Sequence, residues 1–403
     1  MNFFFCTKGG KDTPFYGFNQ SKFIDLAVQI VVNTRLLLKD RLEGIGWFTR
    51  QTLERITKQN PDIHFVFIFD RPYSEEFIFS DNITPIILSP KARHPFMYWF
   101  WLQVQVKSLL RRMKPDLFLS PDGMLVLGAG CKQLPVIHDI NFLHYPQHNK
   151  WLTAKYYNYF FPRFAREASR IATVSEYSRA DIAASYGINP SKIDVVYNGV
   201  NPFFRPLSEE EKTSVRQQYT EGKAYFLYVG SLHPRKNIPA LINAFASFKT
   251  ETQSDIKLLL AGPLFWGLAE IRNAIQQSKL GADIVLTGRL TDEELARVMG
   301  AALVFTYIPL FEGFGIPLLE AMESGVPILS SNTTSLPEVA GQAALLVDPE
   351  NHNEIKNAMH TIYNKADIRQ KLISNGFIQK QLFSWDKSAH LLWESITKTL
   401  AQK

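Results

Sequence analysis

Two adjacent basic residues, Arg235 and Lys236, follow a short run of β-forming residues that ends at Gly230. An amphipathic segment starts at about residue 237, so both cations stand beside the expected start of a helix. A helix N-terminus offers free backbone N–H groups, and arginine can grip a phosphate through two donors. The loop therefore suits a phosphate-bearing ligand, although a solvated basic pair that only caps a loop would have the same sequence.

Two carboxylates, Glu312 and Glu320, frame a glycine-containing segment with the sequence EGFGIPLLE. Pro317 can open a helix in its first turn, which would leave Glu312 in the preceding loop and place Glu320 about one turn into the helix. Gly313 and Gly315 let backbone amides approach a ligand closely. The simpler alternative is that both acids only complement a helix dipole. Their position after a strand in the same half as the basic pair favours a shared site at one sheet edge.

Composition indicates an ordinary globular protein. The chain has 403 residues, 46% of them apolar and 20% charged, which suggests about two or three domains. Two cysteines cannot form a disulfide framework, so a reducing cytosol fits best. The formal charge of +6 suits phosphate-bearing substrates or an anionic membrane, and the absence of a long basic run argues against nucleic acid. No apolar run reaches the roughly 18–20 residues that a membrane span needs.

The elements that must position these residues alternate short β-branched or aromatic runs with longer amphipathic ones, which is typical of parallel sheets covered by helices. In the first half, strands are predicted at 27–37, 64–70, 84–89, 117–121, 134–139, 170–175 and 192–199. In the second half, strands are predicted at 224–230, 256–262, 283–288, 302–309, 327–331 and 343–348. The main helices are predicted at 47–59, 95–114, 178–185, 237–249, 351–379 and 383–402.

The pattern restarts after a polar stretch at 206–223, so we predict an α/β fold of two doubly wound domains. In such sheets, ligands bind at the carboxyl ends of the strands. Two sheets of this kind that face each other would leave the substrate site in a central cleft. The expected parts are an N-terminal appendage that is not a signal peptide over 1–24, a first domain over 25–205, a second domain over 206–382 and a crossover helix over 383–403.

Several segments together resemble one known family. GSLHPRKN, EGFGIPLLEAMESGVPILSS and SLPEVAGQAALLVDP in the second half are similar to the retaining glycosyltransferase family 4, the group 1 glycosyltransferases with the GT-B fold. LEGIGWFTRQTLERI, IHDINFLHYP, TVSEYSRADI and VVYNGVNPFFRP in the first half resemble it too. The resemblance runs from about residue 30 to residue 390. It implies two Rossmann-like domains, the first on the acceptor side and the second binding the nucleotide-sugar donor, with a C-terminal helix that returns toward the first.

The resemblance also implies an activity. It predicts a retaining hexosyltransferase that moves mannose or a similar hexose from a GDP- or UDP-sugar to a glycan or lipid-linked acceptor. The expected setting is cell-surface polysaccharide synthesis in the cytoplasm. No resident cofactor and no metal are expected, and the chain has neither an Asp-x-Asp motif nor a His/Cys cluster with ligand spacing.

Individual residues receive roles from the resemblance. Arg235 and Lys236 would hold the donor diphosphate and stabilise the leaving group. Glu312 would lie beside the donor sugar and act through charge and position rather than as a covalent nucleophile, and Glu320 would bind the ribose hydroxyls. His138 would point at the donor sugar, although a histidine at a strand end can instead satisfy a backbone carbonyl. The other expected donor contacts are Gly44, Ile45, Gly46, Gly230, Phe314, Gly315 and Ile316.

Three other functions fit parts of the pattern. A GT-B nucleotide-sugar epimerase would share the fold, but the spacing of Glu312 and Glu320 downstream of the basic pair argues against it. A non-catalytic sugar-nucleotide-binding protein is disfavoured because all the expected polar residues are present. A dinucleotide oxidoreductase would need a Gly-x-Gly-x-x-Gly turn. The segment Gly44-Ile45-Gly46 continues with Trp47, which fits that turn poorly.

Residues 93–114 combine aromatic and basic side chains in one predicted helix. Such a helix could lie on an anionic bilayer and give peripheral contact at the inner face of the membrane. The alternative is an ordinary domain helix whose aromatic side chains pack on the sheet and whose cations are solvated. The residues concerned are Phe96, Tyr98, Trp99, Phe100 and Trp101, with Lys107, Arg111, Arg112 and Lys114.

Overall fold

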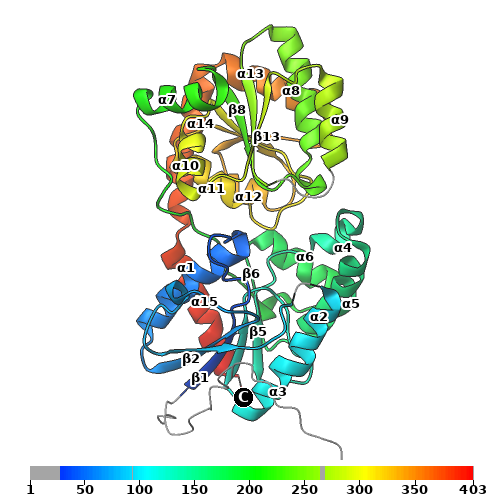
Figure 1. Cartoon of the computed structure of the whole chain (residues 1–403), viewed down its shortest axis with the longest axis vertical. Helices are drawn as coiled ribbons and strands as arrows, with labels where there is room; N and C mark the ends of the chain where they lie inside the picture. Colours follow the sequence, from blue (N-terminus) through cyan, green and yellow to red (C-terminus); the bar gives the residue numbers. More distant parts are fainter. Residues whose placement is uncertain (1–27, 93, 264–267, 403) are drawn as a thin grey trace, which may run out of the picture.

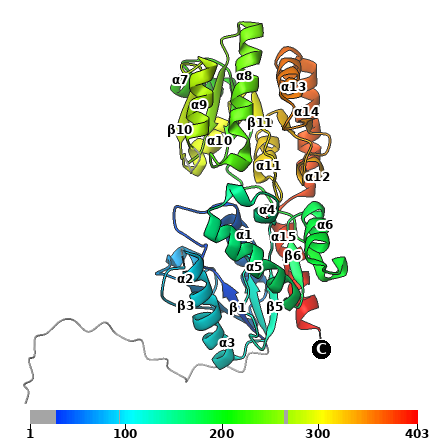
Figure 2. The same cartoon turned by 90° about the vertical axis from the view of Figure 1, so that its right-hand side faces the viewer.

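The computed structural model describes residues 28–92, 94–263 and 268–402, so the predicted appendage over 1–24 lies outside the described residues. Two α/β units are stacked along the long axis of the molecule (Figure 1). A quarter turn shows that each unit has helices on both sides of its sheet (Figure 2). Every strand pair in the two main sheets is parallel. The predicted α/β fold of two doubly wound domains is confirmed.

The first sheet has the order β3-β2-β1-β4-β5. A bridge between Val136 and Ala172 connects it to the pair β6–β7. Ile30 and Val32 of β1 enter one core cluster, whereas Val31 enters another. Because successive side chains of a strand point to opposite faces, both faces of this sheet are buried. The strands are β1 (Val28–Asn33), β2 (Ile63–Phe69), β3 (Ile83–Ile87), β4 (Leu117–Ser120), β5 (Lys132–Pro135), β6 (Ile171–Thr173) and β7 (Ile193–Val195).

The helices of the first unit differ from the prediction at two places. Helix α1 already starts at Gly44, so the Gly44-Ile45-Gly46 segment forms its first turn rather than a preceding loop. Helix α5 contains Pro162 and a dense run of tyrosine and phenylalanine, which hid its helical pattern in the sequence. The helices are α1 (Gly44–Gln59), α2 (Pro95–Phe100), a π-helical turn (Trp101–Val106), α3 (Lys107–Met113), α4 (Asn141–His144), α5 (Trp151–Glu167) and α6 (Glu176–Tyr186).

The second sheet has the order β10-β9-β8-β11-β12-β13, which repeats the arrangement of the first. In both sheets the order reverses beside the first strand of the unit, and doubly wound sheets bind ligands at this point. The strands are β8 (Tyr225–Val229), β9 (Lys257–Ala261), β10 (Ile284–Gly288), β11 (Val304–Tyr307), β12 (Ile328–Ser331) and β13 (Ala344–Val347).

The helices of the second unit also include two departures from the prediction. The polar stretch at 206–223 is not only a junction, because Ser208 and Glu211 form a capping box that starts helix α7. The single helix predicted over 351–379 is divided at Lys365. The helices are α7 (Glu209–Thr220), α8 (Ile238–Thr252), α9 (Leu268–Ser278), α10 (Asp292–Gly300), α11 (Ile316–Glu323), α12 (Leu336–Ala340), α13 (His352–Asn364) and α14 (Ala366–Gln379).

The last helix, α15 (Trp385–Leu400), returns to the first unit and packs on α1 and β5 (Figure 1). Trp385 is buried, and its indole N–H donates to Asn201 Oδ1 at 3.3 Å. Ser395 Oγ donates to Asp194 at 2.7 Å, and Lys132 Nζ donates to the Leu400 carbonyl at 2.7 Å. The predicted return of the C-terminal helix is therefore confirmed. Within the described residues, no helix has the length and apolar character to cross a bilayer.

Candidate active site

The basic pair and Glu312 meet at the carboxyl edge of the second sheet. Arg235 and Lys236 follow β8, and Glu312 follows β11, its neighbour in the sheet. Arg235 Nη1 donates to Glu312 Oε1 at 2.6 Å, and Lys236 Nζ donates to the same oxygen. One carboxylate therefore holds both cations, at the shared sheet edge that the sequence predicted.

This cluster is nearly closed to solvent. Lys236 and Glu312 are each 8% exposed, and Lys236 Nζ also donates to Tyr307 Oη at 2.6 Å. Burial lowers the pKa of Lys236 to about 8, although the negative charge of Glu312 opposes the shift. Burial alone would raise the pKa of Glu312, but Arg235 and Lys236 together hold it below its usual range. Glu312 is thus ionised at neutral pH and supplies the charge that the two cations need in the absence of an anionic ligand.

Glu320 lies in the middle of α11 and is 9% exposed. Unlike Glu312, its carboxyl group has no hydrogen-bond or ion-pair partner in the part of the chain that the structure describes. Burial, with a smaller contribution from the negative charge of Asp292, raises the pKa of Glu320 to about 8. A buried carboxyl group without a protein partner can accept hydrogen bonds from the hydroxyls of a ligand.

Two helix N-termini from different units face each other beside this cluster. A Cβ atom built on Gly44, the first residue of α1, would lie 3.8 Å from Ile316 Cδ1, at the first residue of α11. Among the described residues, neither helix has a side-chain hydrogen bond from its N-cap or an acidic residue in its first turn. By contrast, α7 and α10 each have a capping box and three acidic residues there. Glu43 is the N-cap residue of α1, but its side chain makes no capping hydrogen bond. The first backbone N–H groups of α1 and α11 therefore stay available to an anion.

The other residues of the predicted donor set contribute differently. Gly315 caps α11 with φ of 95°, a conformation that favours glycine. The Phe314 side chain is buried against Tyr197 and Phe383, so only its backbone can serve a ligand. The Gly230 N–H already donates to the Ala261 carbonyl at 2.9 Å, so that amide is not free for a ligand.

His138 approaches the site from the first unit, just after β5. Its Nε2 pairs with the Pro121 carbonyl oxygen at 2.9 Å, and its ring lies edge-on to Phe48 at 5.1 Å. Burial lowers the pKa of His138, so the imidazole is neutral at pH 7. This bond to a backbone carbonyl is the one expected if His138 only satisfies a carbonyl group at a strand end. His138 also meets the second unit, because a Cβ atom built on Gly313 would lie 2.5 Å from the His138 carbonyl oxygen.

Two serines of the first unit, which the sequence did not point to, contact the backbone of Gly313 and His138. Ser175 Oγ donates to the Gly313 carbonyl at 2.7 Å, and Ser178 Oγ lies within 3.3 Å of that oxygen. Ser178 Oγ also lies 3.2 Å from the His138 carbonyl oxygen. Ser175 is the N-cap of α6, which was the one signal for it in the sequence.

A second contact between the units was also missed. Glu338 of α12 accepts hydrogen bonds from the backbone N–H groups of Glu176 and Tyr177 at 2.9 and 3.1 Å. It also accepts one from Tyr197 Oη at 2.8 Å. A carboxylate of the second unit thus caps the start of α6 in the first, which fixes how the two sheet edges meet.

The structure describes the ranges 28–92, 94–263 and 268–402. There, no group of three or more His, Cys, Asp or Glu side chains is arranged to hold a metal ion. Positive charge at the candidate site comes from Arg235, Lys236 and the two helix N-termini.

Comparison with known proteins agrees with this geometry. Residues 42–203 match the family described as Glycosyltransferase Family 4, and residues 209–379 match the one described as Glycosyl transferases group 1. The chain belongs to the family 4, group 1 glycosyltransferases. The predicted family and the predicted transferase activity are confirmed.

Two curated relatives of this glycosyltransferase are mannosyltransferases by name. The O-antigen chain mannosyltransferase B of Escherichia coli is 30% identical over 256 residues, which are 63% of this chain and 67% of that protein. The serotype-specific mannosyltransferase WbdA of Escherichia coli is 32% identical over 241 residues, which are 59% of this chain and 29% of that protein. The matched part of the chain thus spans about two thirds of the first relative and less than a third of the second.

The fold has counterparts among solved structures. The crystal structure of Anabaena Alr3699/HepE in complex with UDP and glucose aligns with 92% of this glycosyltransferase and 99% of its own chain. The TM-score is 0.71 and the sequence identity is 18%, a likeness that shows the fold. The predicted GT-B architecture of two Rossmann-like units is thereby confirmed.

Proposed function

We propose that this glycosyltransferase transfers mannose or a similar hexose, with retention, from a GDP- or UDP-sugar to a glycan or lipid-linked acceptor. The observation that carries the proposal is the pair Arg235 and Lys236, bound to one carboxylate beside two uncapped helix N-termini. This is a preorganised receptor for a diphosphate. The names of the mannosyltransferase relatives support the sugar, and the O-antigen names support cell-surface polysaccharide synthesis. The UDP in the Anabaena protein supports a nucleotide donor.

In the proposed reaction, the bond between the anomeric carbon and the diphosphate oxygen breaks. Negative charge grows on the leaving phosphate, where Arg235, Lys236 and the backbone amides of Phe314 and Gly315 stabilise it. The acceptor oxygen attacks the same face of the sugar, and its proton passes to the leaving phosphate oxygen. When the phosphates bind the two cations, the Glu312 carboxylate is released from them and can stabilise positive charge on the sugar.

The remaining roles follow from position. Glu320 would accept hydrogen bonds from the ribose hydroxyls. It is buried in α11, the helix that follows Phe314 and Gly315, and its carboxyl group lacks a partner among the described residues. His138 would contact the donor sugar as a neutral imidazole. Family membership does not favour an epimerase or a non-catalytic binding protein. We place the reaction in the cytoplasm, at the inner face of the membrane, with peripheral contact through the exposed side chains of the segment 93–114.

The test is a thermal-shift panel with GDP-mannose, UDP-glucose and ADP-glucose, followed by transfer of the stabilising sugar to a lipid-linked glycan. A ligand that binds only the native state raises Tm by mass action, with about 2.7 kcal/mol of stabilisation at a hundredfold excess over Kd. Arg235→Met should abolish the shift, whereas Arg272→Met, at an exposed position on α9, should leave it unchanged. A flat response to all three donors would refute the proposed function.

A further inference from the structure

Large apolar side chains stand out of the first unit along two neighbouring helices, α2 and α5. We call them the aromatic face. Scattered exposed apolar residues are ordinary, but a contiguous group of this size marks an interaction surface. The members and their exposed fractions are Phe96 (64%), Trp99 (41%), Trp151 (68%), Leu152 (43%) and Tyr159 (54%).

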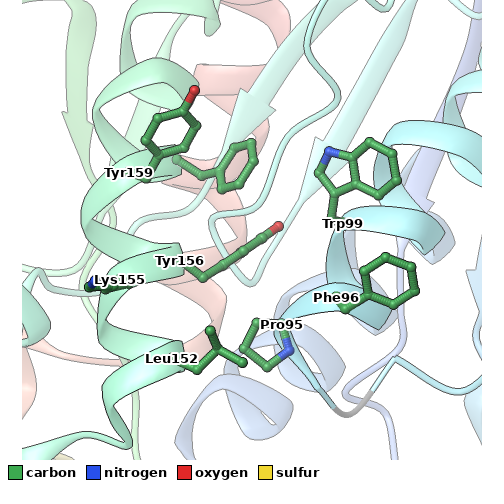
Figure 3. Close-up of a pocket in the computed structure, with 8 residues that line it drawn as sticks. Pro95, Phe96, Trp99, Leu152, Lys155, Tyr156 and Tyr159 are labelled. Carbon is green, nitrogen blue, oxygen red and sulfur yellow. The ribbon is translucent and has the colours of Figure 1, made fainter.

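The aromatic face borders an open groove of about 580 Å³ between the two helices (Figure 3). Pro95, Phe96 and Trp99 line it from α2, and Leu152, Tyr156 and Tyr159 line it from α5. The rings of Trp99 and Tyr159 stand on opposite walls (Figure 3). Each helix follows a strand of the parallel sheet, so both begin near the sheet edge that carries His138. The surface therefore lies on the first unit, beside the carboxyl edge of its sheet.

Positive charge is concentrated on α5 and on α3, which continues α2 through the π-helical turn. Residues 95–113 and α5 together contain six basic residues and one acidic residue, a net charge of +5 out of +6 for the whole chain. Two of the cations lie over rings of the aromatic face. Lys155 Nζ lies 3.9 Å from the centre of the Trp151 ring, and the Arg163 guanidinium lies 3.6 Å from that of Tyr159. Aromatic rings flanked by cations suit the headgroup region of an anionic bilayer.

The structure also corrects the surface that the sequence suggested. Within 93–114, Trp101 is fully buried and donates from its indole N–H to the Leu88 carbonyl at 2.8 Å. Lys107 is engaged as well, because its Nζ donates to the Leu127 carbonyl at 2.5 Å. Only part of that segment is therefore available for docking. The other part of the surface comes from α5. This helix is distant in sequence, so the pattern of residues 95–114 gave no sign of it.

We propose that the aromatic face docks the protein on an anionic lipid bilayer, with the rings at headgroup depth and the cations against the lipid phosphates. The charge complementarity favours a bilayer over an uncharged partner. Docking in this orientation would hold the acceptor side of the active site beside the membrane surface. The proposal does not depend on the donor, since the aromatic face lies outside the cluster of Arg235, Lys236 and Glu312.

The experiment is co-sedimentation of the full chain with vesicles of phosphatidylcholine that contain about one third phosphatidylglycerol. We expect binding at low salt that weakens as salt rises. The double variant Phe96→Ser/Trp151→Ser should lower the partition coefficient by roughly tenfold or more, because it removes two large apolar side chains. The double variant Lys155→Gln/Arg163→Gln should lower it by roughly fivefold for each charge removed.

A matched control is available on the second unit. Ile378 and Leu382 are 68% and 58% exposed, so Ile378→Ser/Leu382→Ser removes similar apolar area elsewhere and should leave vesicle binding unchanged. The donor-induced Tm shift of each variant, measured on the same samples, reports folding and the donor site separately from docking. A protein that shifts with donor but does not bind vesicles at low salt overturns the docking proposal alone.

Three other results would also overturn it. The first is equal binding to vesicles of pure phosphatidylcholine, because the cations would then have no role. The second is unchanged binding by Phe96→Ser/Trp151→Ser. The third is a dimer in sedimentation velocity that this double variant dissociates, because the aromatic face would then be covered by a second copy of the chain.

Discussion

A Cβ atom at Gly313 would stand 2.5 Å from the carbonyl oxygen of His138. The residue next to the key carboxylate therefore touches the backbone of the other unit, with no room for a side chain. Because Asp139 Cβ also lies close, at 2.8 Å from the same position, the contact cannot be relieved by moving one flexible group. This close approach couples the position of Glu312 to the way the two units meet.

Gly313→Ala should therefore push the units apart. Overpacking of this kind costs about 1–3 kcal/mol, so we expect kcat/KM to fall by roughly five- to 150-fold. Each unit keeps its own core, so Tm should change little. Gly281→Ala is the control, because no atom lies within 4 Å of a Cβ there and its φ is ordinary. Wild-type activity of Gly313→Ala would show that this contact does not govern the reaction.

Glu312→Gln keeps the shape of the side chain but removes the charge that the two cations share. If Glu312 acts on the sugar in the transition state, kcat should fall by about 100- to 1,000-fold. Donor Kd should change far less, because Arg235 and Lys236 still bind the phosphates. Single-turnover rates and donor titrations measure the two effects separately. Glu323→Gln, which removes an ion pair with Lys380 at the other end of α11, serves as the control. Equal losses of turnover and donor affinity would disprove the assignment.

The lowered pKa of Lys236 predicts two opposite responses to alkaline pH. Its pKa in the folded protein is about 8, below its ordinary 10.5. As pH rises from 8 to 10.5, the unfolded chain binds more protons at this residue, so the free energy of unfolding should gain from it. Donor affinity should instead fall above pH 8, by about tenfold per pH unit where only the ammonium form binds.

Isothermal titration and chemical unfolding at several pH values measure the two responses. Glu320 has a similar pKa, but because it is a carboxyl raised to about 8, it makes the free energy of unfolding fall as pH rises from 4.5 to 8 and adds no further change above 8. Lys236→Arg keeps its charge throughout, so its donor affinity should stay level above pH 8. If the decline persists in Lys236→Arg, the titration of Glu320 rather than of Lys236 causes it.

The parts of the site that local sequence determines were predictable. Arg235, Lys236 and Glu312 follow neighbouring parallel strands, and such strands end at one sheet edge, so their meeting required only the strand pattern. Glu320 followed from Pro317 and the helix that it opens. The shared use of one Glu312 oxygen by both cations could not be predicted, because it depends on side-chain geometry in a buried cluster.

The contacts between the units were beyond the reach of sequence patterns. Glu338 caps α6 from a segment more than 150 residues away, and neither periodicity nor a local motif records which helix it meets. The start of α1 at Gly44 was missed for a different reason. Glycine is a weak helix former, so the pattern placed these residues in a loop, whereas in the structure Gly46 lies so close to Leu36 and Leu42 that the turn has little room for a larger residue.

Removal of divalent metal should leave the reaction intact. Arg235 and Lys236 already supply two positive charges to the leaving diphosphate. Helices α1 and α11 add two N-termini, and neither has an acidic residue in its first turn among the described residues. We expect turnover in excess EDTA to stay within about twofold of the untreated enzyme, since no Lewis acid is needed for this charge. The Lys236→Met variant should lose more activity in EDTA than the wild type does, because it retains only one of the two cations. Loss of wild-type activity in EDTA that Mg²⁺ or Mn²⁺ restores would contradict this prediction and show that the diphosphate is bound as a metal complex.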